Sequence, residues 1–250
     1  MKILAICGSP HKGNCYSVLN FIKENYPAIN LNILMLNDVN LEQCRGCYVC
    51  VQRGEEKCPL EDDRDMIIKD MLATDGVIFA TPVYVNHISA LMKHFIDRLG
   101  FMAHRPCFFG KYALVMAVCA GFGADKANDY MRGIFSVFGF KIVSSLELKI
   151  ATKTEKEKTY THKQTIKAFD TFISRIQKGQ NDTLKPTLLQ LIYFNIFKSL
   201  SELTKKTNGA DYEFYKDKTD FIYDTKVNLS KNMLAKSIAK KEVRKIMMNR

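Results

Sequence analysis

Short, continuous apolar runs alternate with segments of helical periodicity over the first 150 residues of this 250-residue chain. A continuous apolar run is typical of a strand buried on both faces, whereas apolar positions three or four apart indicate a helix. The pattern predicts strands at 2–7, 31–36, 76–81, 112–120 and 141–150. It predicts helices at 15–26, 62–73, 88–99, 126–139 and 161–177. This alternation predicts an α/β fold with a doubly wound, five-stranded parallel sheet.

The pattern changes near residue 180, where the polar stretch KGQNDTLKP predicts a linker. Beyond it, TLLQLIYFNIFKSL (187–200) predicts a strongly apolar helix, and ADYEFYKDKTDFIYDTKV is suited to lying over a neighbouring surface. The last segment, SKNMLAKSIAKKEVRKIMMNR, predicts a helix with one apolar face formed by Leu234, Ile238, Val243, Ile246 and Met247. We therefore expect two domains, 1–180 and a mainly α-helical extension 181–250 that packs as a built-in subdomain.

The composition is that of an ordinary globular protein, with 47% hydrophobic and 25% charged residues. No apolar run approaches the roughly 18 residues that span a bilayer, and the N-terminal MKILAICGSP lacks the features of a signal peptide. We therefore expect a cytoplasmic protein with reduced thiols.

Positive charge is concentrated in the second part of the chain. Residues 1–150 have a net charge of +1, and residues 151–250 have a net charge of +10. Residues 226–250 alone hold eight Lys or Arg against one acid, so weak contact with an anionic membrane surface is one interpretation of this tail. A basic nucleic-acid-binding module is a weaker one, because the aromatic interleaving and groove-reading motifs are missing, and we expect no nucleic-acid partner.

Three loops carry the candidate chemistry, because ligands of doubly wound sheets bind at the carboxyl ends of the strands. GSPHKGN (8–14) offers hydroxyl, amide and backbone N–H groups at the start of a helix, which suits a phosphate, although a plain tight turn would look the same. TPVYVNH (81–87) offers Tyr84 and backbone amides to a planar ring, unless Tyr84 is a core residue. CAGFG (119–123) supplies glycines for a close backbone approach. Neither a P-loop nor a G-x-G-x-x-G fingerprint is present.

Together, GSPHKGN and TPVYVNHISALMKHFIDR make residues 1–150 resemble the flavodoxin-like NAD(P)H-dependent FMN reductases. The resemblance implies a flavodoxin-like fold that binds FMN, with the phosphate on the first loop and the isoalloxazine ring beside the second and third. The implied cofactor-binding residues are Ser9, His11, Lys12, Asn14, Cys15, Ser17, Pro82, Val83, Tyr84, Val85, Asn86, Gly121 and Phe122. Two residues depart from the family pattern: His11 stands where Arg is usual, and Cys15 stands where a hydroxyl residue is usual.

Four of the eight cysteines lie in CRGCYVCVQRGEEKC, residues 44–58, which we call the cysteine loop. Reduced, clustered thiols indicate metal or redox ligands, and this compact spacing allows four thiolates to reach one small cluster. The motif resembles that of the iron–sulfur flavoproteins, which implies a [4Fe–4S] cluster on Cys44, Cys47, Cys50 and Cys58. Zinc and cluster-free thiols remain alternatives, although structural zinc sites usually use two separated ligand pairs.

We therefore predict an FMN-dependent oxidoreductase or electron-transfer flavoprotein that passes electrons between a cluster and FMN. The alternative is a cluster-free NAD(P)H-dependent FMN or quinone reductase. The expected partners are NAD(P)H or a redox protein such as ferredoxin, and a small-molecule acceptor. The resemblance also implies a homo-oligomer. The sequence identifies no catalytic side chain.

Overall fold

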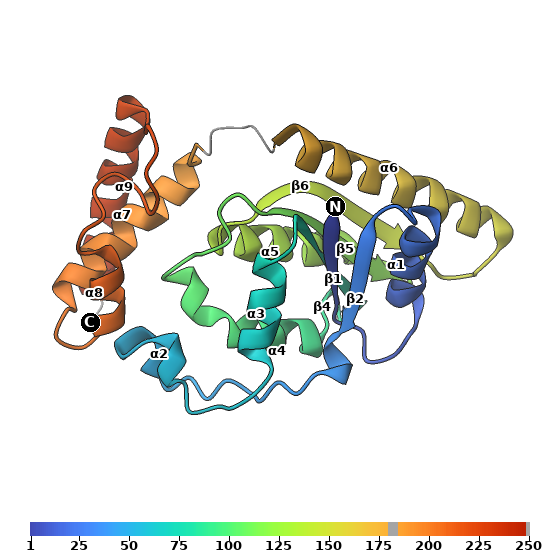
Figure 1. Cartoon of the computed structure of the whole chain (residues 1–250), viewed down its shortest axis with the longest axis horizontal. Helices are drawn as coiled ribbons and strands as arrows, with labels where there is room; N and C mark the ends of the chain where they lie inside the picture. Colours follow the sequence, from blue (N-terminus) through green and yellow to red (C-terminus); the bar gives the residue numbers. More distant parts are fainter. Residues whose placement is uncertain (180–184, 249–250) are drawn as a thin grey trace. The chain divides into compact units, whose positions relative to one another are not determined.

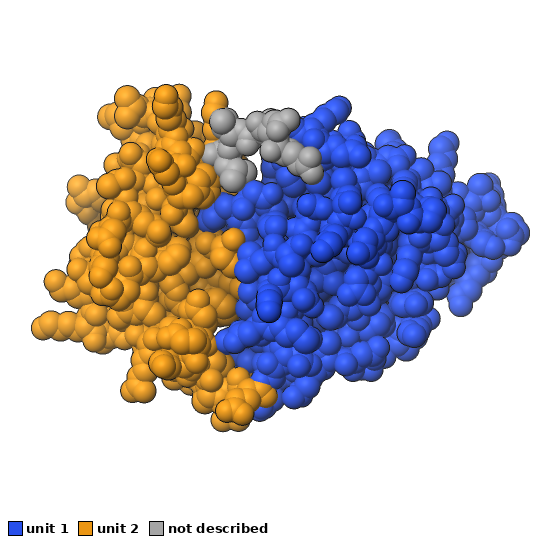
Figure 2. Space-filling view, viewed as in Figure 1, with its two compact units in different colours: residues 1–44, 62–100, 108–181 blue, residues 45–61, 101–107, 182–250 orange. Residues whose placement is uncertain are grey.

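The computed structural model describes residues 1–179 and 185–248, so the centre of the predicted linker, 180–184, lies outside the described residues. The chain forms two compact units, shown separately coloured in Figure 2. Unit 1 comprises Met1–Cys44, Asp62–Gly100 and Phe108–Asn181. Unit 2 comprises Arg45–Glu61, Phe101–Cys107 and Asp182–Arg250. Most of the cysteine loop therefore belongs to the same unit as the C-terminal helices.

Unit 1 is built on a parallel sheet with the strand order β2-β1-β3-β5-β6 (Figure 1), which confirms the predicted α/β fold. Its strands are β1 (Lys2–Cys7), β2 (Asn30–Met35), β3 (Gly76–Tyr84), β5 (Tyr112–Cys119) and β6 (Lys141–Lys149). The short β4 (His87–Ile88) pairs antiparallel with the end of β3. Because β1, β3 and β5 are adjacent and parallel, their carboxyl ends meet at one edge of the sheet.

Helices cover both faces of this sheet. The helices of unit 1 are α1 (Asn14–Asn25), α3 (Arg64–Leu72), α4 (Ala90–Arg98), α5 (Ala124–Val137) and α6 (Glu155–Gly179). Apolar side chains of α1 and α6 share one core cluster with alternate residues of the strands, among them Ile78 and Ala80. Phe79 points to the other face, where it stacks on Phe135 of α5 with ring centroids 3.5 Å apart.

Helix α6 begins at Glu155, six residues before the predicted start. The carboxylate of Glu157 accepts hydrogen bonds from the backbone N–H groups of Ala151, Thr152 and Lys153, and the Thr154 hydroxyl accepts from the N–H of Glu157. These bonds lower the pKa of the Glu157 carboxyl and hold Lys153 in a left-handed conformation with φ 55°. The signal was present in the sequence as Thr-x-x-Glu, which is typical of a helix start.

Unit 2 is mainly helical, as predicted for the C-terminal extension. Its helices are α2 (Val49–Gln52), α7 (Leu188–Leu203), α8 (Gly209–Tyr215) and α9 (Leu229–Met248). Thr187 and Gln190 form a capping box that starts α7. Among the described residues, the chain has no helix with the length and apolarity needed to cross a membrane.

The predicted apolar face of the last helix was correct only in part, since Val243 is buried and Ile238 is half-buried. Leu234, Ile246 and Met247 are exposed, whereas α9 buries Asn232, Ala235, Ala239 and Val243. Helix α9 packs against α7, and two of its buried residues, Ala235 and Ala239, have small side chains. Small side chains, rather than the largest apolar ones, therefore mark the packed face.

Candidate functional site

Hydrogen bonds and close contacts join the three predicted ligand loops at the carboxyl edge of the sheet. The Gly8 N–H donates to the Ala80 carbonyl over 2.8 Å, and the Ser89 hydroxyl donates to the Gly8 carbonyl over 2.6 Å. Asn86 of the second loop lies against Gly123 of the third, where a Cβ on the glycine would lie 2.4 Å from the Asn86 side-chain oxygen. The structure therefore brings together the loops that the sequence singled out.

The first loop presents an open helix end. Ser9 is buried, and its hydroxyl donates to the His11 carbonyl over 2.8 Å, so this side chain holds the turn. His11 and Lys12 are exposed, and the Lys12 ammonium lies 5.3 Å from the centre of the Tyr16 ring. No described side chain caps α1 at Gly13, which leaves the N–H groups of its first turn directed out of the helix end.

Cys15 lies on the inward side of α1 and is buried in the core cluster. Burial and the nearby Cys7 raise the pKa of its thiol well above the usual range. Its side chain therefore stays a neutral core thiol, and only its backbone N–H is available to a ligand.

Asn14 and Ser17 line a groove of about 240 Å³ between α1 and α6. Lys153 and Lys158 also line this groove, and the stacked rings of Phe21 and His162 form part of its wall. The capped turn after β6 thus places a lysine beside two of the predicted phosphate-binding residues. Sequence reasoning missed Lys153, because it lies far from the first loop along the chain.

The second loop is a strained turn. Val85 and Asn86, between β3 and β4, both have left-handed backbones with φ 49° and 64°. This conformation is a genuine outlier for a β-branched residue such as valine. Val85 is nevertheless 99% exposed, so its side chain gains no burial that would offset the strain. The side-chain oxygen of Asn86 is buried without a hydrogen-bond partner among the described residues.

The third loop adds a second exposed apolar side chain, Phe122, which is 79% exposed. Gly123 follows with φ 96° and is the N-cap of α5. Pro82 and Val83 are half-buried behind the turn, and Tyr84 is exposed. Strain, exposed apolar side chains and an unpaired buried oxygen together fit a site for a planar, polar-edged ring such as a flavin. The open end of α1 fits its phosphate.

The segments that flank the cysteine loop are joined by hydrogen bonds within unit 1. The backbone N–H groups of Asn40 and Glu42 donate to the carboxylates of Asp63 and Asp62 over 2.8 and 2.9 Å. Asp62 also accepts two hydrogen bonds of 2.9 Å from the guanidinium of Arg98. Both side chains of this ion pair are almost fully buried, at 1% and 3% exposure. Asp62 therefore forms the base of the loop.

This buried carboxylate predicts acid sensitivity. Burial alone would raise the pKa of Asp62, but hydrogen bonds from Arg98 and from the N–H groups of Glu42 and Arg64 outweigh it and lower the pKa. In the unfolded chain the Asp62 carboxyl has a pKa of about 3.9. Its contribution to the free energy of unfolding is therefore complete above that pH, and it is lost as the pH falls through the lower pKa of the folded state. We expect urea unfolding from about pH 6 to about pH 3 to show this loss, with a shallower pH dependence in Asp62→Asn. Equal dependences would contradict the assignment.

The four cysteines of the motif differ in their exposure to solvent. Cys44 and Cys47 are exposed, and Cys50 and Cys58 are half-buried. In the part of the chain that the structure describes, no three Cys, His, Asp or Glu side chains are grouped to hold a metal ion. The loop conformation described by the structure therefore does not fit a cluster or a zinc ion.

Comparison with known proteins relates both the fold and the cysteine motif to named families. A family model described as NADPH-dependent FMN reductase matches residues 1–155. The chain is 30% identical over 228 residues to an "Iron-sulfur flavoprotein" of Archaeoglobus fulgidus, covering 87% of this chain and 99% of that relative. It is 29% identical over 226 residues to an "Iron-sulfur flavoprotein" of Clostridioides difficile, covering 86% of this chain and 95% of that relative.

Solved structures share the fold at low sequence identity. The structure of RosB with bound 8-demethyl-8-formylriboflavin-5'-phosphate has a TM-score of 0.57 and 14% identity, and covers 92% of each chain. A structure named flavone reductase has a TM-score of 0.54 and 17% identity, covering 74% of this chain and 66% of that one. At these identities the likeness shows the flavodoxin-like architecture and carries no residue roles.

Proposed function

This chain belongs to the NADPH-dependent FMN reductase family, with iron–sulfur flavoproteins as relatives over most of its length, and we propose from that premise how its loops serve an electron-transfer flavoprotein. It is an FMN-dependent oxidoreductase. When bound, FMN supplies the chemistry, exchanging hydride with two-electron donors and single electrons with one-electron carriers. The protein's part is to hold the ring and phosphate and to set their surroundings.

The observation that carries the FMN site is the strained turn at Val85 and Asn86. A left-handed valine that exposes its side chain is expected where a ligand covers it, and Phe122 on the neighbouring loop is exposed in the same way. We propose that the ring lies against Pro82–Asn86 and Gly121–Phe122. We propose that the phosphate lies on the first turn of α1, with contacts from Ser9, His11, Lys12, Asn14, Ser17 and the Cys15 N–H.

Gly123→Ala tests the ring site. A Cβ at Gly123 would lie 2.4 Å from the Asn86 side-chain oxygen and 3.1 Å from the Asn86 Cα, so the turn must shift. We expect FMN affinity to fall about tenfold, or about 1.4 kcal/mol, in a fluorescence titration of the flavin-free protein. Gly133→Ala is the matched control, because its Cβ would meet no described atom within 4 Å and Gly133 lies in α5, outside the ligand loops. Equal effects of the two changes would count against the assignment.

Lys153→Gln tests the phosphate end. Lys153 shares a groove with Asn14 and Ser17, so its ammonium can complement a phosphate that the exposed His11 holds less firmly than an arginine would. We expect FMN affinity to fall about tenfold while riboflavin, which lacks the phosphate, binds as before. Lys156→Gln controls for net charge, since Lys156 is exposed in the first turn of α6 and does not line the groove. Parallel losses for FMN and riboflavin would exclude a phosphate contact.

For the cysteine loop, we propose that Cys44, Cys47, Cys50 and Cys58 hold a [4Fe–4S] cluster. The support is the motif spacing together with the iron–sulfur flavoproteins that match most of the chain. Holding one cluster would require the thiols to move closer together than they are in this structure. No residue role at FMN depends on this cluster.

The separated thiols favour a second candidate, a cluster-free NAD(P)H-dependent FMN or quinone reductase. Steady-state oxidation of NAD(P)H separates the two. A reductase turns over rapidly with NAD(P)H and a quinone or free FMN. An electron carrier instead accepts electrons from a reduced redox protein such as ferredoxin and shows little NAD(P)H oxidation.

A further inference from the structure

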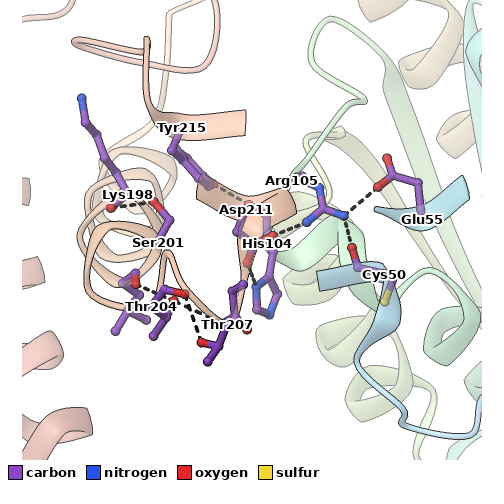
Figure 3. Close-up of polar contacts among 12 residues, drawn as sticks. Cys50, Glu55, His104, Arg105, Lys198, Ser201, Thr204, Thr207, Asp211 and Tyr215 are labelled. Carbon is purple, nitrogen blue, oxygen red and sulfur yellow. Dashed lines mark hydrogen bonds and ion pairs between the residues drawn. The ribbon is translucent and has the colours of Figure 1, made fainter. Parts of the chain in front are cut away.

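Unit 2 contains a buried ion pair that the proposed cofactor site does not use. Arg105 and Asp211 are both almost fully buried, with side chains 6% exposed, and an Arg105 guanidinium nitrogen donates to an Asp211 carboxylate oxygen. Figure 3 shows this pair at the centre of a group of polar side chains. A buried guanidinium is stable only when its donors are satisfied, so the remaining partners of Arg105 are informative.

Those partners belong to the cysteine loop. A second guanidinium nitrogen of Arg105 donates to the backbone carbonyl of Cys50 over 2.7 Å and to the carboxylate of Glu55 over 2.6 Å (Figure 3). Cys50 is one of the four cysteines of the motif, and Glu55 lies between Cys50 and Cys58. One side chain therefore connects the centre of the cysteine loop to α8.

The segment that carries Arg105 is itself held by α8. The Nδ1 atom of His104 lies 2.7 Å from the second carboxylate oxygen of Asp211, and the Tyr215 hydroxyl donates to the His104 carbonyl. Tyr215 is almost completely buried. Asp211 thus holds the side chains of His104 and Arg105, and Tyr215 holds the backbone at His104.

This arrangement requires arginine. The planar guanidinium contacts a carboxylate on one side and a carbonyl and a second carboxylate on the other, which a compact ammonium at the end of a flexible stem does not reproduce. Glu55 is partly exposed, so its charge alone would hold the loop weakly. The buried pair with Asp211 supplies the rigidity.

We propose that Arg105 is a positioning residue for the cysteine loop, fixing the Cys50–Glu55 part to the C-terminal helices independently of any bound metal. The function of the helical extension is then to hold this part of the loop. The connection to a cluster rests on the proposed function. The fixing of the loop does not.

The test uses the full-length, iron-free protein with the thiols reduced. We expect Arg105→Met to increase amide hydrogen exchange across residues 45–61, and the rate of iodoacetamide alkylation of Cys50 and Cys58, at least about tenfold. Peptide mass spectrometry resolves each cysteine. Arg105→Lys should restore only part of the protection, because its ammonium cannot serve all three partners together. Arg132→Met is the matched control, since Arg132 forms an exposed pair with Asp129.

Two further variants keep the proposal testable if Arg105→Met does not fold. Arg105→Met with Asp211→Asn removes both buried charges together, and Glu55→Gln removes only the loop-side ion pair. Each should raise the alkylation of Cys50 while FMN binding is unchanged. Wild-type exchange and alkylation in a folded Arg105 variant would overturn the proposal.

Anaerobic addition of iron and sulfide separates this proposal from the cluster assignment. If the wild type binds both, Arg105→Met should bind less iron and show an altered visible spectrum, with partial recovery in Arg105→Lys. If the wild type binds neither, the cluster assignment fails, while faster alkylation in Arg105→Met still supports the positioning role. An unaltered spectrum and iron content in a loaded Arg105→Met would contradict its role in placing the thiols.

Discussion

Replacing Asp62 by alanine will lower the free energy of unfolding by about 3–5 kcal/mol, because the change leaves the buried guanidinium of Arg98 without its carboxylate. The carboxylate also accepts backbone hydrogen bonds from Glu42 and Arg64, so its removal deletes those two bonds as well. Urea unfolding at neutral pH measures the loss.

Asp129→Ala is the matched control for this change. Asp129 pairs with Arg132 on α5, but the two side chains are 63% and 50% exposed, and an exposed pair contributes only about 0–1 kcal/mol. A similar small effect of Asp62→Ala would show that the base of the cysteine loop does not depend on the Asp62–Arg98 pair.

If the cysteine loop holds the proposed cluster, Cys47→Ser will remove nearly all bound iron while sparing FMN, because a neutral hydroxyl is a poor substitute for a thiolate ligand and Cys47 lies outside the three flavin loops. Iron and sulfide assays after anaerobic purification, beside the flavin absorption of the same sample, measure both cofactors. Cys107→Ser is the control, since Cys107 is another exposed thiol of unit 2 that lies outside the motif. Wild-type iron in Cys47→Ser would exclude Cys47 as a ligand.

The sheet could be predicted from the sequence because its strands are buried on both faces and appear as apolar runs such as 76–81 and 112–120. The ligand loops followed from topology, since parallel neighbours bring their carboxyl ends together. Helix α8 could not be predicted with the same ease, because it has seven residues and its burial depends on Asp211 and Tyr215 finding partners elsewhere in the chain.

The two buried ion pairs could not be predicted from the sequence either, because the partners of each pair lie far apart along the chain. Asp62 and Arg98 are 36 positions apart, and Arg105 and Asp211 are 106 apart, so no local pattern joins them. The left-handed Val85 was equally unpredictable, because a β-branched residue gives no signal for that conformation. The sequence shows that Ser9 lies in the first loop, but only the structure shows that its hydroxyl donates a hydrogen bond to the His11 carbonyl.

Anaerobic purification of the full-length chain, followed by an absorption spectrum and by assays for FMN, iron and sulfide, tests the central claim most directly. We predict a coloured protein with about one noncovalent FMN per chain and about four iron and four sulfide, giving broad visible absorption beneath the flavin bands. FMN without iron or sulfide would contradict the cluster and leave the simpler reductase. A colourless protein that takes up no FMN on titration would contradict the flavoprotein assignment itself.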